Sequence, residues 1–154
     1  MSEPLNVRAV RREDFMNWKP LWDGYNAFYE RSGPTALPDE ITQMTWSRFF
    51  DAYEPMHALV FEQADRLVGL VHYIFHRTTA SIAPTCYLQD LFTVEEARGK
   101  GIGRALIEAV YRRAFEAGCV RVYWLTHESN TVGMRLYDKV AEKSGFVQYR
   151  KQPL

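Results

Sequence analysis

Residues 98–104, with the sequence Arg-Gly-Lys-Gly-Ile-Gly-Arg, contain the strongest chemical signal in the chain. Three glycines on alternate positions let the backbone adopt unusual φ/ψ angles, turn its N–H groups in one direction and admit a ligand at close range. A helix is predicted to begin near Gly103, and its first N–H groups and its dipole favour an anion. Arg98, Lys100 and Arg104 add positive charge. The segment therefore predicts a site for a phosphate-bearing ligand, most simply a pyrophosphate.

Two common phosphate-binding motifs do not match this segment. A P-loop requires Lys and then Ser or Thr after its last glycine, whereas Gly103 is followed by Arg104 and Ala105. A dinucleotide-binding fingerprint requires Gly-x-Gly-x-x-Gly, whereas Gly99, Gly101 and Gly103 alternate with other residues throughout. The segment is therefore assigned to neither of these classes of nucleotide-binding protein.

A second group of residues with chemical potential lies nearer the C-terminus. Asn130 is a favourable N-cap for a predicted helix, and Tyr137 shares its face because a seven-residue step falls only about 20° short of two full turns. Gly133 lies on or near that face, and a glycine inside a helix costs about 1 kcal/mol relative to alanine. This cost indicates that something passes close to the helix. Leu136 and Val140 form a separate i, i+4 pair for the core.

Both groups match motifs of one known family. The order Arg-x-x-Gly-x-Gly at residues 98–103 resembles the acyl-CoA pyrophosphate loop of the GNAT superfamily of N-acetyltransferases. The order Asn-x-x-Gly-x-x-Leu-Tyr at residues 130–137, followed by Ser-Gly-Phe at 144–146, resembles the ending of the same enzymes. The resemblance covers residues from about 57 to 149. Within the superfamily, residues 87–92 and 123–128 look like the polyamine and histone N-acetyltransferase branch.

The resemblance implies that acetyl-CoA is the cosubstrate and lies between the central strand and the next one. Backbone groups at the end of the strand would bond the pantetheine and the acetyl carbonyl, and the glycine loop would hold the pyrophosphate. An amine would attack the thioester directly, Tyr137 would protonate the departing thiolate, and Asn130 would contact the cofactor arm. The cofactor-binding residues implied in this way are Phe92, Thr93, Val94, Arg98, Gly99, Lys100, Gly101, Ile102, Gly103, Arg104, Asn130 and Tyr137.

The group that deprotonates the amine is left open by the sequence. At pH 7 only about one alkylamine molecule in a thousand is neutral, so a proton must leave before the attack. Related polyamine acetyltransferases carry a glutamate where this chain has Gln89, and a glutamine is not a useful proton acceptor. Asp90 is the nearest carboxylate, although strand alternation turns it away from Gln89 unless a bulge intervenes. Glu128 and a chain of water molecules to bulk solvent are the alternatives.

The acceptor is expected to bind beside two helices in the N-terminal third of the chain. In the superfamily this region forms one wall of the acceptor groove, which makes Tyr29 and Glu30 candidate acceptor contacts, together with Tyr25 and Phe28. Simple core packing explains the aromatic residues equally well. The full set of expected acceptor-binding residues is Tyr29, Glu30, Gln89, Asp90 and Glu128.

The remaining pattern alternates strands and helices. Strands are predicted over residues 5–10, 57–63, 67–75, 87–94, 120–126 and 146–149, with the second and third joined as a hairpin and a looser segment over 77–85. Helices are predicted from 13 or 14 to 30, from 38 onward, from 103 to 118 and from 131 to about 143. The second helix has Ile41, Met44, Phe49 and Ala52 as its apolar positions. This order predicts an α+β fold, a mixed α/β sandwich. The resemblance implies the GNAT acyl-CoA N-acyltransferase fold, with a mixed central sheet of about six to seven strands flanked by helices.

The composition is that of a globular chain. With 154 residues, 47% hydrophobic and 25% charged, it predicts a single domain over residues 1–154. The 19 basic and 19 acidic residues give a formal net charge of zero, which disfavours a general nucleic-acid-binding protein. The start Met-Ser-Glu-Pro has no signal-peptide pattern and no apolar run approaches the roughly 20 residues of a membrane span, so a cytoplasmic location is expected. Cys86 and Cys119 are expected to be free buried thiols, and the histidines show no metal-ligand spacing.

Together these observations predict an acetyl-CoA-dependent N-acetyltransferase that works by direct attack in a ternary complex. Its acceptor would be a primary amine of a polyamine, an amino acid or a similar small molecule, or a protein lysine. The alternative is a non-catalytic acyl-CoA-binding sensor of the same fold, which Tyr137 argues against and Gln89 favours. The aromatic share of 14% and the resemblance to the polyamine branch also predict a homodimer or a higher homo-oligomer, and no nucleic acid, membrane or metal is expected as a partner.

Overall fold

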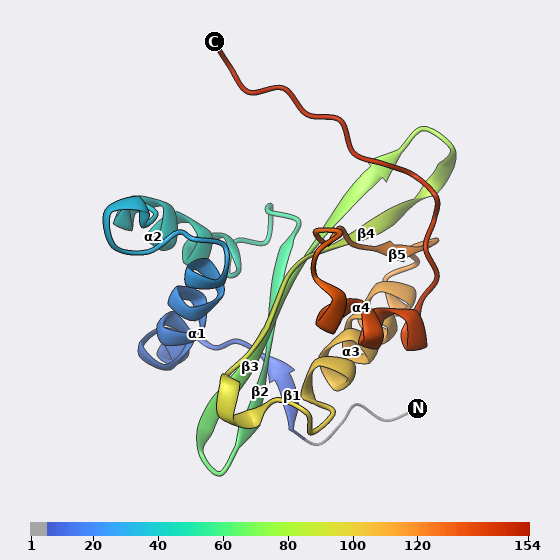
Figure 1. Ribbon diagram of the computed structural model, residues 1–154. Helices are drawn as coiled ribbons and strands as arrows, with labels where there is room; N and C mark the ends of the chain where they lie inside the picture. Colours follow the sequence, from blue (N-terminus) through green and yellow to red (C-terminus); the bar gives the residue numbers. More distant parts are fainter. Residues whose placement is uncertain (1–5) are drawn as a thin grey trace. The chain divides into compact units, whose positions relative to one another are not determined.

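The computed structural model describes residues 6–154, so Leu5, with which the first predicted strand begins, lies outside the described residues. The chain divides into two compact units, residues 1–124 and 125–154 (Figure 1). The first unit contains a five-stranded sheet with its covering helices, and the second contains one α-helix and the C-terminal segment. The organisation of the chain as a single domain stays a prediction.

The sheet of the first unit is mixed, as predicted, and its strands lie in the order of the chain. The strands are β1 (Val7–Ala9), β2 (Met56–Gln63), β3 (Arg66–Thr78), β4 (Ser81–Thr93) and β5 (Val122–Tyr123). Neighbours from β1 to β4 are antiparallel, and β5 pairs in parallel with β4. The predicted hairpin is therefore confirmed as β2 and β3.

Several predicted strand boundaries are wrong. Residues 77–85, expected to be looser, belong mostly to β3 and β4, which form a second hairpin with Thr78 paired to Ser81. The strand predicted over 120–126 is reduced to the two residues of β5. Residues 146–149 form no strand, so the described chain has a five-stranded sheet rather than one of six or seven strands. Strand formation requires a partner at the right distance, which local β-propensity does not specify.

The predicted helices are all present. They are α1 (Phe15–Phe28), α2 (Asp39–Arg48), α3 (Ile102–Glu116) and α4 (Thr131–Val140), the last of which ends before the predicted boundary at 143. Pro20 lies inside α1 and does not end it. Within residues 6–154, no helix is both long and apolar enough to cross a membrane.

The buried face of α2 differs from the predicted one. Thr42 and Trp46 are buried at i, i+4 spacing, whereas Ile41 and Met44 are 42% and 52% exposed. The indole of Trp46 lies 4.7 Å from that of Trp18, centroid to centroid. Contact with the aromatic side of α1, rather than the distribution of apolar residues along α2, therefore selects the buried face.

The sheet is covered by α1 and α2 on one face and by α3 on the other (Figure 1). On the α1 face, a core cluster contains Leu70 of β3 together with the indoles of Trp18 and Trp22. The neighbouring residue Gly69 faces α3, because an added Cβ would come within 3.0 Å of Ile102 and Leu106. Successive strand residues thus point to opposite faces, and the aromatic residues of the N-terminal third mainly build one of the two cores.

Candidate active site

Strand β4 has one paired edge and one edge that is partly open. It pairs with β3 as far as Thr93, whereas β5 pairs with it only at Cys86 and Tyr87. Among the described residues, no strand therefore lies beside the second edge of β4 from Leu88 to Thr93. An open edge presents unpaired backbone N–H and C=O groups, which suit an extended ligand that carries amides.

The backbone groups that face this open edge differ in part from the predicted set. The N–H of Val94 donates to the carbonyl oxygen of Val68 at 2.9 Å, so Val94 is turned toward β3. Because backbone groups alternate along a strand, Phe92 is turned the same way, and Leu91 and Thr93 face the open edge. Of the three residues 92–94 expected to bond the pantetheine, only Thr93 points its backbone groups outward, and its carbonyl already accepts from Arg98 Nε at 3.0 Å.

A β-bulge decides where Asp90 points. His72 of β3 lies opposite Asp90, and the next residue, Tyr73, lies opposite Leu88, so Gln89 is the extra residue on β4. The bulge breaks the regular alternation and turns Asp90 toward α1, on the same face as His72. Gln89 itself is exposed. The predicted role of Asp90 depends on a bulge in this strand, and that bulge is present.

Asp90 belongs to a buried polar cluster. His72 Nδ1 lies 2.8 Å from Asp90 Oδ2, and the indole Nε1–H of Trp18 donates to His72 Nε2 at 3.1 Å. The hydroxyl of Tyr25 lies close enough to Asp90 to interact with it. His72 is 2% exposed and Asp90 8%. Burial, and next the charge of Asp90, raise the pKa of Tyr25, so this phenol stays protonated and uncharged.

A cation lies on the other side of Tyr25. The guanidinium of Arg31 is 5.8 Å from the ring centroid of Tyr25 and 5.3 Å from that of Tyr29. Its Nε donates to Asn26 Oδ1 at 2.8 Å, and the buried Asn26 is itself anchored to the carbonyl of Trp22. Within the described part of the chain, Arg31 forms no ion pair with a carboxylate. Its charge is therefore held in place without being neutralised.

The two residues predicted on the acceptor wall have different surroundings. Tyr29 is half-exposed and its ring packs against that of Tyr25 at 5.0 Å. Burial raises the pKa of Tyr87, and the charges of Asp90 and Tyr29 contribute, so these groups lie near one another. Glu30 is exposed and has a left-handed φ of 60°. The structure therefore brings Tyr29 and Asp90 to one face of the sheet, with Glu30 at its surface.

The glycine loop leads directly into α3. Gly99 and Gly101 have φ values of 76° and 82°, a region that favours glycine, and Gly101 is the N-cap residue. No side chain caps the first turn of α3, so its N–H groups remain oriented toward the loop. An added Cβ at Gly99 or Gly101 would meet nothing within 4 Å. The loop therefore combines open space with a helix N-terminus, as an anion site requires.

The cations of the loop are exposed and held by local contacts. Arg98 donates from Nε to the carbonyl of Thr93 at 3.0 Å and lies over the ring of Phe92 at 5.7 Å. Lys100 reaches the carbonyl of Glu96 at 3.3 Å, and Arg104 pairs with Glu108 at 2.8 Å. Ile102 is buried beneath the loop. The three charges predicted from sequence thus surround the start of α3.

The second unit carries the other predicted motif. Asn130 caps α4 by accepting from the Gly133 N–H at 3.1 Å, as predicted, and its amide group donates to Thr126 Oγ1 at 2.9 Å. A Cβ on Gly133 would lie 2.5 Å from the Asn130 side chain, so the glycine makes room for the cap rather than for a ligand. Tyr137 lies on α4 and is half-buried, and Glu128 is exposed before it.

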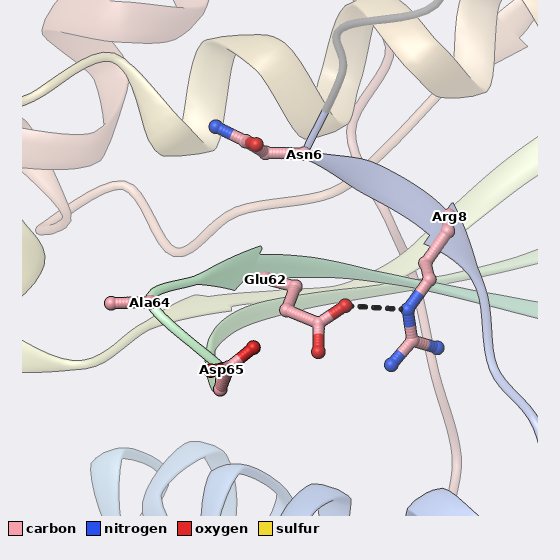
Figure 2. A pocket seen from close by; sticks show the side chains of 5 residues that line it. All are labelled: Asn6, Arg8, Glu62, Ala64 and Asp65. Atoms are coloured by element: carbon pink, nitrogen blue, oxygen red, sulfur yellow. Dashed lines mark hydrogen bonds and ion pairs between the residues drawn. The ribbon is translucent and has the colours of Figure 1, made fainter.

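Other features of the described residues do not compete with this site. The hollow in Figure 2 is lined by Asn6, Arg8, Glu62, Ala64 and Asp65, and its arginine is already paired with Glu62 at 2.9 Å and with Asp14 at 2.7 Å. No group of three or more metal-ligating side chains occurs among residues 6–154, and the expected absence of a metal stays a prediction.

The cysteines do not act as nucleophiles at neutral pH. Both are buried and free, as predicted. Burial raises the pKa of the Cys86 thiol to about 12, and it also raises the pKa of Cys119. Because the thiolate is the reactive form, acetyl transfer through a cysteine intermediate is disfavoured.

Three residues at the site were missed by reasoning from the sequence. Trp18, His72 and Arg31 were not among the predicted site residues. The available signal was the combination of a histidine and an aspartate on adjacent strands with a tryptophan on a preceding amphipathic helix. That signal has meaning only when the register of β3 and β4 is known.

Comparison with known proteins agrees with this geometry. Residues 18–141 match the Acetyltransferase (GNAT) family. The D-amino-acid N-acetyltransferase HPA3 of Saccharomyces cerevisiae is 36% identical over 153 residues, which cover 98% of this chain and 92% of that protein. An uncharacterized N-acetyltransferase of Bacillus subtilis, YhfO, is 24% identical over 94% of this chain and 95% of that protein.

Solved structures show the same fold. The aminoglycoside N-acetyltransferase AAC(6')-Iy, solved in complex with CoA, superposes with a TM-score of 0.81 at 15% identity, over 100% of this chain and 98% of that chain. The expected GNAT fold is thereby confirmed, whereas placement in the polyamine and histone branch stays a prediction. The family match over most of the chain and the similarity to HPA3 show that this protein belongs to the GNAT acetyltransferase family and is an N-acetyltransferase.

Proposed function

We propose that this acetyltransferase transfers the acetyl group of acetyl-CoA to the amino group of a free amino acid. The observation that carries the proposal is the pair of opposite charges beside Tyr25, which lies next to Asp90 and whose ring lies beneath Arg31. An amino acid carries both an ammonium and a carboxylate, which these two side chains would recognise. The acceptor named for the yeast relative, a D-amino acid, supports the same class.

Polyamines and protein lysines fit these charges less well. A polyamine carries several ammonium groups, and Arg31 would repel those that do not bind Asp90. A lysine side chain presents no carboxylate for Arg31. Glu30, the acidic residue among the candidate acceptor contacts, is exposed to solvent, where an ion pair contributes little.

The proposed reaction assigns a task to each group. Residues 98–104 hold the pyrophosphate, and the open edge of β4 at Leu91 and Thr93 binds the pantetheine amides. Asp90 holds the incoming ammonium, which loses a proton to solvent. The amine nitrogen then attacks the thioester carbonyl carbon, and the C–S bond breaks as the tetrahedral intermediate collapses. Tyr137 protonates the departing thiolate, a role that rests on the family resemblance. The extra proton on the new amide nitrogen leaves to solvent, from which Tyr137 regains its own proton.

The first test compares an amino acid with its own amide. In the parent protein, kcat/KM should be higher for the acid, because only the acid offers a carboxylate to Arg31. Arg31→Met should lower kcat/KM about tenfold for the acid and less than about twofold for the amide. Both enantiomers, a polyamine and a lysine peptide complete the panel, with CoA thiol release as the readout.

Arg12→Met is the matched control for this test, because Arg12 also lies over an aromatic ring, that of Phe50 at 4.8 Å. Arg12→Met should leave kcat/KM unchanged for both the acid and the amide. A parent enzyme that prefers the polyamine or the peptide, or an Arg31→Met variant that loses activity on acid and amide alike, would contradict the amino-acid proposal.

The second test addresses the CoA loop. Gly101→Glu would set a negative charge against the phosphates and should weaken CoA binding at least about tenfold by calorimetry. Gly118→Glu is the control, because Gly118 follows the other end of α3, has a φ of 86° against 82° for Gly101, and likewise has nothing within 4 Å of an added Cβ. Both variants carry the same backbone strain. Equal CoA affinity in the two would reject the loop as the pyrophosphate site.

The third test addresses Tyr137 as the acid. Tyr137→Phe keeps the ring and deletes the proton donor, so kcat should fall at least about tenfold while acetyl-CoA affinity stays within a few-fold. Single-turnover rates should be measured as well, because slow product release can hide a change in chemistry. Tyr53→Phe, at a residue 99% exposed, is the control. Equal single-turnover rates in parent and Tyr137→Phe would remove Tyr137 from the mechanism.

We also propose that the protein is a homodimer that buries its C-terminal segment. Phe146, Val147 and Tyr149 are 91%, 76% and 93% exposed, and no residue of 125–154 is fully buried within one chain. Clustered exposed apolar residues of this kind are typical of a surface that another chain covers. The occupant we propose is a second copy of the same chain.

Light scattering at micromolar concentration tests the dimer. The parent should have twice the 18.0 kDa mass of one chain, and the double variant Phe146→Asp, Tyr149→Asp should shift toward that single mass. Tyr53→Asp, another change at an exposed tyrosine, should leave the mass unchanged. A parent protein with the molar mass of a single chain would contradict the dimer proposal.

A further inference from the structure

The buried cluster around Asp90 contains a histidine whose protonation state is set by its neighbours. Trp18 Nε1–H can only donate, and it donates to His72 Nε2. That nitrogen must therefore carry a lone pair rather than a hydrogen. The one remaining ring proton is on Nδ1, which lies 2.8 Å from Asp90 Oδ2 and donates to it. His72 is thus neutral, and both of its nitrogens are used.

The surroundings of the ring favour this single arrangement. The rings of Phe49, Trp22 and Trp18 lie 4.7, 5.5 and 5.9 Å from that of His72, centroid to centroid, so the imidazole is enclosed by aromatic side chains. A second proton on Nε2 would point at the hydrogen of the Trp18 indole. Rotation of the ring would break both hydrogen bonds at once, because each nitrogen has its own fixed partner.

We infer that His72 is a positioning residue that holds Asp90 ready for the acceptor ammonium, in a neutral Nδ1–H tautomer selected by Trp18. This inference rests on the proposed function in assigning Asp90 to the amine. A neutral donor orients the carboxylate without cancelling its charge, whereas an imidazolium would form an ion pair with Asp90 and compete with the substrate. Tyr25, the other polar neighbour of Asp90, is also uncharged, so neither residue neutralises the carboxylate.

Two substitutions separate the two hydrogen bonds of His72. In His72→Asn the amide nitrogen takes the place of Nδ1 and can still donate to Asp90, but Trp18 loses its acceptor. In His72→Gln the longer side chain reaches the place of Nε2 and can accept from Trp18, but Asp90 loses its donor. The inference predicts that His72→Gln raises the acceptor KM about tenfold, and that His72→Asn raises it less than about threefold. The KM for acetyl-CoA should not change in either variant.

A merely structural role predicts a different result. If His72 only filled the core, acceptor KM would follow thermal stability, and the less stable variant would also bind the acceptor less well. The stability of both variants is therefore measured alongside their kinetics. His57→Phe is the control, because His57 stacks on Tyr73 at 5.1 Å in the same sheet and touches none of the proposed site residues.

Nitrogen-15 NMR of the parent protein reads the tautomer directly and does not depend on activity. At neutral pH the His72 ring should show a hydrogen on Nδ1 and none on Nε2, and Trp18→Phe should remove this fixed pattern. A ring protonated on Nε2 or on both nitrogens would overturn the inference. Turnover by the parent with equal acceptor KM in His72→Gln and His72→Asn would overturn it too, while leaving the proposed function intact. Absence of amine acetylation by the parent would instead reject the proposed function, and the NMR result would still decide the tautomer.

Discussion

A carboxylate buried against an aromatic core is the constraint on which the acceptor side of this structure depends. Removing an unpaired carboxylate from water is far more costly than the few kcal/mol by which a domain is typically stable, so it must be hydrogen-bonded. Asp90 is hydrogen-bonded to His72 with Tyr25 beside it, and Trp18 satisfies the far side of the histidine. Among the described residues, no buried side-chain nitrogen or oxygen lacks a partner. The position of α1 and the register of β3 and β4 are therefore linked, because both are needed to surround the Asp90 carboxylate with polar partners.

Helix α1 supplies most of this support because one of its faces lies directly over the sheet. Trp18 and Tyr25 are seven residues apart, close to two helical turns, so both reach the same row of strand side chains. Gly24 lies beside them, where an added Cβ would come within 2.7 Å of the Phe92 ring. That ring in turn lies beneath Arg98. The absence of a side chain at Gly24 thus allows the helix to approach the strand that leads into the glycine loop.

Strand β4 connects the polar cluster around Asp90 with the glycine loop. Its α1 face carries Asp90, its open edge carries the backbone groups of Leu91 and Thr93, and its end continues into residues 98–104. The bulge at Gln89 separates the stretch in which Cys86 and Tyr87 pair on both edges from a stretch that pairs only with β3. The proposed side-chain site for an amine and the proposed backbone site for an amide chain are therefore placed on consecutive residues of one strand.

The features that the sequence determined are local ones. The φ values of Gly99 and Gly101, the start of α3 and the cap of α4 by Asn130 each depend on residues within one turn of the chain, so their types and spacing were sufficient to predict them. The family resemblance could also be recognised from these two motifs, because each consists of residues of a given type at a fixed short spacing in the sequence. Gly133 shows the limit of such reasoning, since its neighbour proved to be the side chain of Asn130.

Only the tertiary structure decided how the acceptor side is arranged. Whether Asp90 faces α1 depends on a one-residue shift in the pairing of β3 with β4, and such a shift leaves no mark on the local hydrophobic pattern. The role of His72 depends on Trp18, 54 residues earlier in the chain. The length of β5, and whether residues 146–149 form a strand, likewise depend on whether a partner strand is present. These contacts are specified by distance between elements, and a distance of that kind is a property of the packed fold rather than of any single stretch of sequence.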